Sequence, residues 1–149
     1  MSATSTVSVC LWYDGKAEEA ARFYTSLIPN SEIKSTSPFM VTFTLDGVPF
    51  QAMNGGPKFK PNEAASIVVH TKDQEETDRL WNALTANGGA ESRCAWLKDR
   101  FGVSWQIVPE ILPKLFGSPD RQAANRAMQA MLQMSKIDIA ALEAAFNGS

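Results

Sequence analysis

The chain of 149 residues is long enough for one domain or for two small modules that share a core, and its 44% hydrophobic and 20% charged residues are typical of a globular protein. A formal net charge of −2 gives no basic surface for nucleic acid or an anionic membrane, so neither is an expected partner. No apolar run approaches the roughly 18–20 residues that span a bilayer, and residues 1–6 lack the basic start of an export signal. With only Cys10 and Cys94 as cysteines, we expect a cytoplasmic protein.

The first half of the sequence predicts a strand, a helix and three further strands. Residues 7–13 are rich in β-branched and aromatic side chains, which favours a strand. Between residues 17 and 27, small and apolar residues recur every three or four positions, which indicates an amphipathic helix. Three short strands are then expected, at residues 32–35, 40–45 and 48–54, with Asp46-Gly47 as the tight turn between the last two. Together these elements form a βαβββ module over residues 7–55.

A second module of the same kind is predicted over residues 64–109, after a turn-rich connector at residues 54–61. It begins with a β-branched strand at residues 65–70. The helix that follows, from Gln74 to Ala86, ends at the left-handed cap Asn87-Gly88-Gly89. Two or three strands complete this module, and the last of them covers residues 103–109.

The two modules carry the same kind of hexapeptide near their ends. Gly47-Val48-Pro49-Phe50-Gln51-Ala52 is echoed fifty-five residues later by Gly102-Val103-Ser104-Trp105-Gln106-Ile107. The two predicted helices also superpose at an offset of 57, which places Trp81 on Tyr24 as a bulky anchor. We conclude that the chain contains an internal duplication, and that its fold is α+β with two paired βαβββ modules.

A C-terminal helical tail is predicted over residues 118–147. Ser118-Pro119-Asp120 has the cap, the proline and the early acid of a helix start, and Asp138 is placed to cap a last short helix. The longer helix has one apolar face, formed by Ala124, Ala127, Met128, Met131 and Leu132. This face fits packing against the domain's own sheet and a dimer contact equally well. The opposite face is not basic, which argues against a membrane surface.

Several stretches of the sequence resemble the PhnB-like proteins. They are Cys10-Leu11-Trp12-Tyr13-Asp14, Glu18-Glu19-Ala20 with Phe23-Tyr24, Asn54-Gly55-Gly56-Pro57, the run of residues 96–109 and, in the tail, Lys136-Ile137-Asp138-Ile139, so that the resemblance covers nearly the whole chain. That family belongs to the vicinal oxygen chelate superfamily, with the glyoxalases, bleomycin-resistance proteins and extradiol dioxygenases. Its members often carry the label 3-demethylubiquinone-9 3-methyltransferase. The resemblance implies a single domain over residues 1–149 in which curled sheets enclose a cleft, commonly in a homodimer.

Enzymes of this superfamily hold a divalent metal with side chains on the first and last strand of each module, usually histidines and carboxylates. The resemblance carries those positions onto Val7 or Val9, Gln51, Ser66 and Gln106. Valine cannot ligate a metal, and serine and glutamine offer only neutral oxygens. His70 shares a strand face with Ser66, but it is the only histidine and lies near the strand end. We therefore expect neither a metal nor another cofactor.

Other catalytic arrangements find little support in the sequence. A chain without a Gly-x-Gly motif or an alternating strand–helix series offers no Rossmann-type site for S-adenosylmethionine. Cys10 has the opposite parity to Val9 and is expected to face the helices as inert packing. Asp99-Arg100 is interpreted as an exposed ion pair before the last hairpin. No residue is assigned a catalytic role.

The repeated glutamines instead predict a ligand cleft. Gln51 and Gln106 alternate with Phe50 and Trp105, so each pair sends its members to opposite sides of its sheet. The resemblance places the amides toward the cleft, where Ser66 adds a hydroxyl for hydrogen bonding. The apolar remainder and the mouth of the cleft are assigned to Leu11, Pro49, Met53, Val68, Trp12, Phe59 and Trp96. In the alternative arrangement, the two glutamines bond each other and close the core.

The residues and the resemblance together lead to three hypotheses about function. The first is a metal-free protein that binds a small, partly apolar molecule as a homodimer. The second is an enzyme, either a metal-dependent lyase or oxygenase with unusual ligands or the methyltransferase of the family label. The third is a purely structural dimer.

Overall fold

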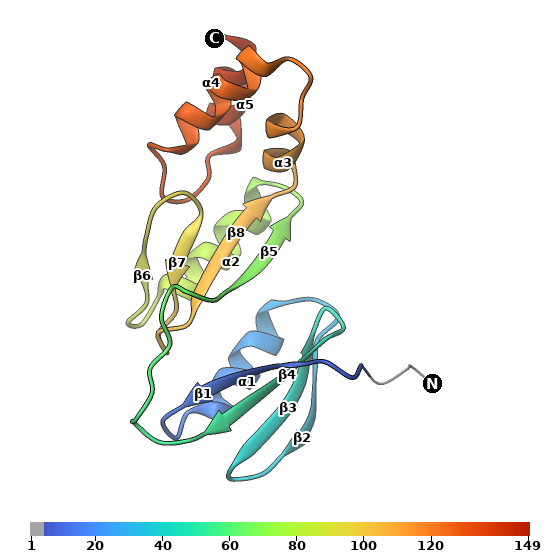
Figure 1. Ribbon diagram of the computed structural model, residues 1–149, viewed down its shortest axis with the longest axis vertical. Helices are drawn as coiled ribbons and strands as arrows, with labels where there is room; N and C mark the ends of the chain where they lie inside the picture. The colour runs from blue at the N-terminus through green and yellow to red at the C-terminus, as the bar shows by residue number, and fades with distance from the viewer. Residues whose placement is uncertain (1–4) are drawn as a thin grey trace. The chain divides into compact units, whose positions relative to one another are not determined.

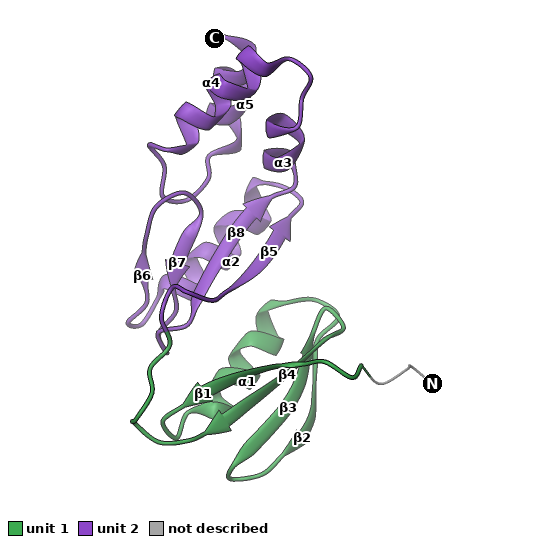
Figure 2. Ribbon diagram, in the orientation of Figure 1, with its two compact units in different colours: residues 1–61 green, residues 62–149 purple. Residues whose placement is uncertain are grey.

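The structure, a computed structural model, describes residues 5–149 and divides the chain into two compact units, Met1–Pro61 and Asn62–Ser149 (Figure 2). Residues 1–4, which make up most of the segment considered for an export signal, lie outside the described residues. Each unit holds one four-stranded sheet and its own helices (Figure 1). No helix in residues 5–149 has both the length and the apolar character needed to cross a membrane.

The first unit is the predicted βαβββ module. Its elements are β1 (Val9–Tyr13), α1 (Ala17–Leu27), β2 (Glu32–Thr36), β3 (Met40–Leu45) and β4 (Val48–Asn54). The strands lie in the order β1-β4-β3-β2, with β1 parallel to β4 and the other neighbours antiparallel. Asp46 and Gly47 form the turn between β3 and β4 with φ angles of 49° and 80°, as the predicted tight hairpin requires.

Helix α1 packs against one side of this sheet (Figure 1). Alternate strand residues fill the space beneath it, and the rings of Phe43 and Phe50 lie 5.4 Å apart there. The buried hydroxyls of Tyr13 and Tyr24 are hydrogen-bonded at 3.0 Å, which joins β1 to the helix. Burial of each large apolar side chain in this core stabilises the fold by about 1.5–3 kcal/mol. The period-two pattern of the strands therefore fixes which side of the sheet is left for other contacts.

The second unit repeats the module and adds three helices. Its elements are β5 (Ser66–Thr71), α2 (Gln74–Thr85), β6 (Ala90–Glu91), β7 (Trp96–Lys98), β8 (Ser104–Pro109), α3 (Ile111–Phe116), α4 (Arg121–Met131) and α5 (Ile139–Asn147). The strands lie in the order β5-β8-β7-β6, with β5 parallel to β8, which is the topology of the first sheet. Asp73 caps α2, and Asn87 follows the helix with a φ angle of 57°. The α+β fold with paired βαβββ modules and a helical tail is confirmed.

The last hairpin of the second unit is built around a buried carboxylate. Asp99 accepts hydrogen bonds from the backbone N–H groups of Phe101 and Val103 at 2.8 and 3.0 Å through Oδ1. Its Oδ2 accepts a third from the indole nitrogen of Trp105 at 2.9 Å. The expectation of an exposed Asp99–Arg100 ion pair is therefore wrong, because Asp99 is buried and serves as the common acceptor for the turn.

The C-terminal extension, residues 110–149, departs from prediction at its beginning. Helix α3 is absent from the predicted elements, because Pro113 in a six-residue apolar segment gives no helical period. Helix α4 starts after Asp120, whose side chain accepts from the backbone N–H of Ala123, while Ser118 Oγ accepts from the N–H of Asp120. The predicted start at Ser118 thus moves by two residues. Asp138 caps α5 as predicted.

The three helices enclose a small core of their own with part of the β6–β7 connection. Its buried residues are Ala95, Leu112, Ala127, Ile137 and Leu142. Met128 and Leu132, two members of the predicted apolar face of α4, remain 40% and 44% exposed. Helix α4 therefore packs mainly against α3 and α5 through its alanines, and not against the sheet.

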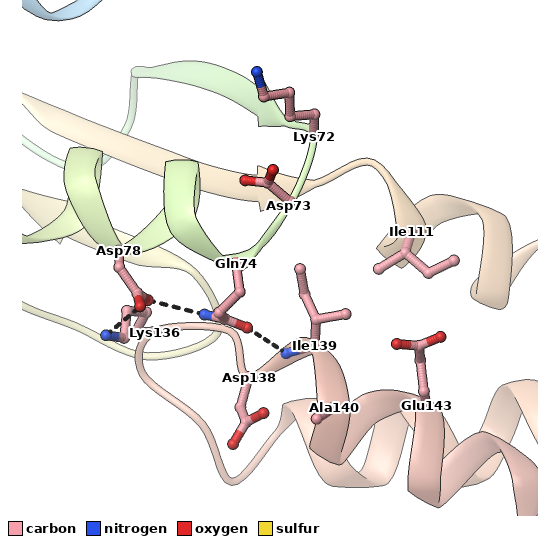
Figure 3. Close-up of a pocket in the computed structure, with 10 residues that line it drawn as sticks. All are labelled: Lys72, Asp73, Gln74, Asp78, Ile111, Lys136, Asp138, Ile139, Ala140 and Glu143. Carbon is pink, nitrogen blue, oxygen red and sulfur yellow. Dashed lines mark hydrogen bonds and ion pairs between the residues drawn. The ribbon is translucent and has the colours of Figure 1, made fainter.

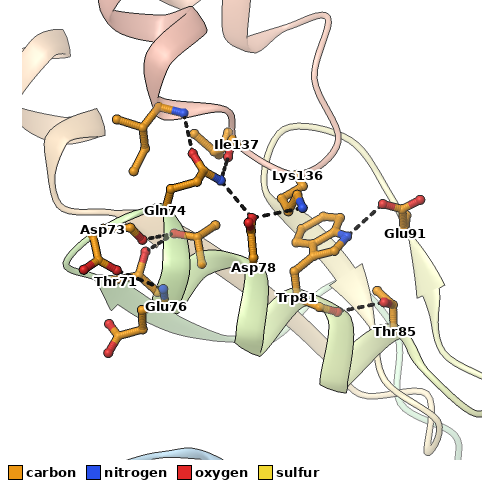
Figure 4. A network of polar contacts seen from close by, with 12 residues as sticks. Thr71, Asp73, Gln74, Glu76, Asp78, Trp81, Thr85, Glu91, Lys136 and Ile137 are labelled. Carbon is orange, nitrogen blue, oxygen red and sulfur yellow. Dashed lines mark hydrogen bonds and ion pairs between the residues drawn. The ribbon is translucent and has the colours of Figure 1, made fainter.

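Gln74, in the first turn of α2, joins the extension to the module (Figure 4). Its Nε2 donates to Asp78 Oδ1 at 2.9 Å and to the carbonyl of Ile137 at 3.0 Å. Its Oε1 accepts from the backbone N–H of Ile139 at 2.8 Å, and Lys136 pairs with Asp78 at 2.9 Å. One amide side chain thereby holds the start of α5 against the start of α2.

Candidate functional site

We call the side of each sheet that faces away from α1 or α2 its open face. In the first unit, Phe50 and Ala52 are buried on the α1 side, and Gln51 between them is half-buried on the open face. The Nε2 of Gln51 donates to Ser8 Oγ at 3.3 Å. The strand register places on this open face Cys10, Trp12, Thr42, Gln51 and Met53, and the hydrogen bond to Gln51 adds Ser8.

Gln106 has the corresponding position in the second unit. Trp105 is fully buried on the α2 side, and Gln106 is half-buried on the other side, where its Nε2 donates to Ser66 Oγ at 3.0 Å. The register places on this open face Ser66, Val68, His70, Trp96, Ser104, Gln106 and Val108. The predicted separation of amide and aromatic side chains is confirmed in both units. Each glutamine amide bonds a serine of its own unit.

Ser8 is missing from the predicted site, although the sequence contains a signal for it. Gln51 pairs in register with Cys10, and Gln106 pairs with Val68. Ser8 lies two residues before Cys10, just as Ser66 lies two residues before Val68. Superposing the first strands at an offset of 58 would have aligned the two serines. The duplication therefore extends to a repeated serine–glutamine pair.

Most of the other predicted cleft residues lie on the open faces. Trp12 and Met53 are register partners in the first unit, and Phe59 of the connector contacts the Trp12 ring. Val68 and Trp96 both pair with Gln106 in the second unit.

Two residues of β1 lie on the opposite side from the one expected. Tyr13 is buried and reaches Tyr24 of α1, so the alternation of β1 also sends Leu11 toward the helix, where it pairs with buried Ala52. Leu11 therefore does not line the face that carries Gln51. The same alternation turns Cys10 outward, and Cys10 is exposed and not packed beneath the helix as expected.

Ser104 places a buried hydroxyl beside the second serine–glutamine pair. It is 1% exposed, pairs in register with Ser66, and its Oγ has no hydrogen-bond partner within residues 5–149. Its other neighbour, Lys98, forms an ion pair with Glu63 at 2.7 Å, and this hydrogen bond lowers the pKa of Glu63. An unpaired buried hydroxyl costs about 1–3 kcal/mol, and the burial of Ser104 keeps its hydroxyl out of reach of a ligand in this structure.

The donor atoms of the open faces do not match a resident divalent metal. Each glutamine offers one neutral carbonyl oxygen, because its amide nitrogen is a hydrogen-bond donor and has no lone pair for a metal. Hard cations prefer carboxylates, and transition metals prefer imidazole or thiolate. His70 is exposed near the end of β5, and the described part of the chain has no cluster of three or more histidine, cysteine or acidic side chains that could hold an ion.

A groove of about 640 Å³ lies in the second unit where α2, α3 and α5 meet (Figure 3). It is lined by Lys72, Asp73, Gln74, Asp78, Ile111, Lys136, Asp138, Ile139, Ala140 and Glu143. Hydrogen bonds from Gln74 and Lys136 lower the pKa of Asp78, and Asp73 and Asp138 cap their helices. Most of its polar groups are thus engaged in holding the extension in place. We interpret the groove as a structural junction.

Comparison with known proteins places the chain in a family. The family model described as 3-demethylubiquinone-9 3-methyltransferase matches residues 5–108. The chain belongs to this family. A solved PhnB protein of Bacillus cereus that carries the same methyltransferase name is 32% identical, with a TM-score of 0.64 over 70% of this chain and 99% of that one.

More distant structures share the fold of this PhnB-like chain. A glyoxalase/bleomycin resistance protein of Albidiferax ferrireducens is 18% identical, with a TM-score of 0.52 over 71% of this chain and 99% of that one. The fosfomycin resistance protein FosX of Listeria monocytogenes is 12% identical, with a TM-score of 0.50 over 72% and 91%. No curated protein matches the sequence significantly.

These findings identify a PhnB-like protein with the vicinal oxygen chelate fold. The two four-stranded mixed sheets differ from the doubly wound parallel sheet that binds dinucleotides and related cofactors at its switch point. The family's methyltransferase name is therefore not matched by a Rossmann-type site in the described residues. Helices α3, α4 and α5 lie beyond the matched segment.

Proposed function

We propose that this PhnB-like protein binds a small, partly apolar molecule on the open faces of its sheets, and that it does so without a resident metal. The observation that carries the proposal is the repeated serine–glutamine pair. Ser8 with Gln51 and Ser66 with Gln106 place one amide at the same position of each open face.

Each pair leaves an acceptor for a ligand. Because Nε2 is held by the serine, Oε1 of the same amide can accept a hydrogen bond, and it makes none within the described chain. Met53, Val68 and Trp96 provide apolar surface next to the amides. A few directed polar groups on an apolar lining are the usual design of a small-molecule site.

Binding alone accounts for the polar groups that are present. The serine–glutamine pairs offer amides and hydroxyls, which orient a ligand but are poor general acids or bases near neutral pH. Sequestration of a molecule needs no proton transfer, so these side chains suffice for it. The serine–glutamine pairs alone do not supply the general acid or base of a lyase or oxygenase reaction.

We further propose that the protein is a cytoplasmic homodimer. Val9 of the edge strand β1 and Val7 just before it are 45% and 73% exposed, and a second copy would cover this apolar edge. Two free cysteines suit a reducing compartment. Analytical ultracentrifugation of the purified chain should give the mass of a dimer, and a purely monomeric protein would contradict the assembly.

Ligand screening by NMR combined with metal analysis tests the proposed function. Untagged protein should contain far less than one metal ion per chain and still bind members of a fragment library. Gln51→Ala and Gln106→Ala should each weaken binding about threefold to tenfold, the value of one hydrogen bond. Gln129→Ala, on the exposed surface of α4, should leave binding unchanged.

Two results would overturn the proposal. One is a stoichiometric metal that is lost from the Gln51→Ala/Gln106→Ala double variant. The other is micromolar binding of S-adenosylmethionine by calorimetry, which would support the methyltransferase of the family name instead.

A further inference from the structure

Several hydrogen bonds of the first unit fix the indole ring of Trp12 on its open face. The Nε1 of Trp12 donates to the carbonyl of Gly56 at 2.8 Å, and the backbone N–H groups of Gly55 and Gly56 donate to the carbonyl of Tyr13 at 2.9 and 3.3 Å. A side chain at Gly55 would overlap the indole, since its Cβ would lie 2.6 Å from Cη2 of Trp12. Glycine at this position is therefore required by the ring and not by the backbone angle.

Asn54 fixes the same motif to the rest of the unit. Its Oδ1 accepts from the backbone N–H of Ala17 at 2.9 Å, at the start of α1. Its Nδ2 donates to the carbonyl of Pro38 at 2.9 Å. The Asn54-Gly55-Gly56 segment thus ties β4, α1 and the loop before β3 together around Trp12. The indole is held rigidly, although it remains half-exposed on the open face.

Phe59 extends this aromatic surface outward. Its ring meets Trp12 edge-on, with centroids 4.9 Å apart and planes at 77°, and the residue is 56% exposed. The ammonium of Lys58 lies 5.5 Å from the centroid of the Phe59 ring, and Lys60 is the residue directly after Phe59. Neither lysine forms an ion pair with another described residue. An aromatic pair and two unneutralised cations are therefore adjacent in one short segment.

We propose that the Trp12–Phe59 pair receives a planar aromatic group of the ligand and that Lys58 and Lys60 attract a negative substituent on it. The inference rests on the proposed function and narrows the ligand of the first unit to an aromatic anion, such as an aromatic carboxylate. Aromatic rings favour offset and edge-on contacts with such a group, and charges at the rim select for its sign. Gly55 is a positioning residue, because it acts only through Trp12.

The test compares 2-naphthoate with the neutral 2-naphthylmethanol by NMR on ¹⁵N-labelled protein. The chain has four tryptophans, so the indole N–H signal of Trp12 can be assigned with Trp12→Phe. Naphthoate should shift this signal and bind about twofold to fivefold more tightly than the alcohol, as expected for a surface ion pair. The difference should shrink between 0.05 and roughly 0.5 M salt, because screening weakens exposed charges.

Variants separate the aromatic contact from the charge. Phe59→Ala should weaken both probes about threefold to tenfold. The double variant Lys58→Ala/Lys60→Ala should bind naphthoate only as tightly as the alcohol. The control Lys72→Ala, at an exposed lysine of the second unit, should leave the affinity for naphthoate unchanged. Gly55→Ala should move the Trp12 indole signal in the ligand-free protein and weaken both probes. All of these changes except Gly55→Ala affect side chains of the exposed connector or surface, where the fold is expected to persist.

The outcomes distinguish this inference from the proposed function. Failure of both probes to bind at millimolar concentration, or equal binding of the two, would overturn the aromatic-anion assignment. Binding that shifts the Gln106 side-chain amide but not the Trp12 indole would overturn it as well and leave the proposed function standing. If neither Gln51→Ala nor Gln106→Ala weakens fragment binding, the proposed function is wrong. The Trp12 assignment is then decided by the two naphthalene probes alone.

Discussion

Asp99 and Gln106 belong to the same hairpin, yet their surroundings give them different tasks. Asp99 is buried and satisfies three donors of the turn, so its role is to define the local fold. Gln106 is half-buried with only its nitrogen engaged, so its oxygen remains available for a ligand. The distinction follows from hydrogen-bond capacity, because a polar group whose acceptors are all used inside the chain has little left for recognition.

Asp99→Ala should lower the free energy of unfolding by roughly 3 kcal/mol or more, because it leaves two backbone donors and the Trp105 indole without their charged acceptor. Urea denaturation followed by tryptophan fluorescence measures this change. Asp14→Asn, at an exposed turn position, should change stability by less than about 0.5 kcal/mol. Similar stabilities for the two variants would contradict the role assigned to Asp99.

In β1, the sequence does not determine which side chains face the helix. The repeated hexapeptide located both glutamines and placed each on the opposite side from a large aromatic residue, and the family resemblance assigned the amides to the cleft side. Residues 7–13 have apolar side chains at both parities, so the strand pattern alone does not say which side faces α1. The tertiary contact between Tyr13 and Tyr24 decides it, and this contact places Leu11 inward and exposes Cys10.

At the scale of elements, the strands, α1, α2 and the capped start of α5 follow from local pattern, and other parts of the extension do not. Helix α3 is too short to show a period, and the start of α4 depends on which of Ser118 and Asp120 bonds the first turn. The β6–β7 connection is also unpredictable locally, because Cys94 and Ala95 have positive φ angles of 55° and 78°. Their backbone N–H groups donate to the carbonyls of Met134 and Ser135, which lie far along the chain.

The junction between α2 and α5 should be sensitive to acid. Hydrogen bonds from Gln74 and Lys136 lower the pKa of Asp78 below its ordinary value of 3.8. A carboxyl group with a lowered pKa in the folded state contributes stability above its unfolded pKa, and this contribution is lost as the pH falls through the lowered value. Because Asp78 and Lys136 are 41% and 34% exposed, the contribution is small, at most about 1 kcal/mol.

Asp78→Asn should therefore have a lower urea midpoint than the parent protein near pH 6, and the two midpoints should converge below pH 3.8. Asp14→Asn provides the matched control, since Asp14 is exposed and forms no ion pair with a described residue. A midpoint difference that grows on acidification would contradict the assigned role of the Gln74–Asp78–Lys136 contacts.

At the scale of the whole molecule, the duplication explains both the fold and the candidate site. The same strand order recurs in each unit, and similar hexapeptides, Gly47–Ala52 and Gly102–Ile107, lead into β4 and β8. A repeated backbone would repeat its binding positions as well, and we propose that the serine–glutamine pairs occupy them. The extension adds a second core to one unit only, and its residues lie outside the segment that matches the family.

The central claim is that recognition occurs through these amides without a metal. The most direct measurement is a titration of ¹⁵N-labelled protein with a bound fragment in excess EDTA, observed at the glutamine side-chain amides. The Gln51 or Gln106 signals should shift, the Gln129 signal should not, and EDTA should leave the affinity unchanged. Binding that disappears with EDTA and returns on addition of a divalent metal would contradict it.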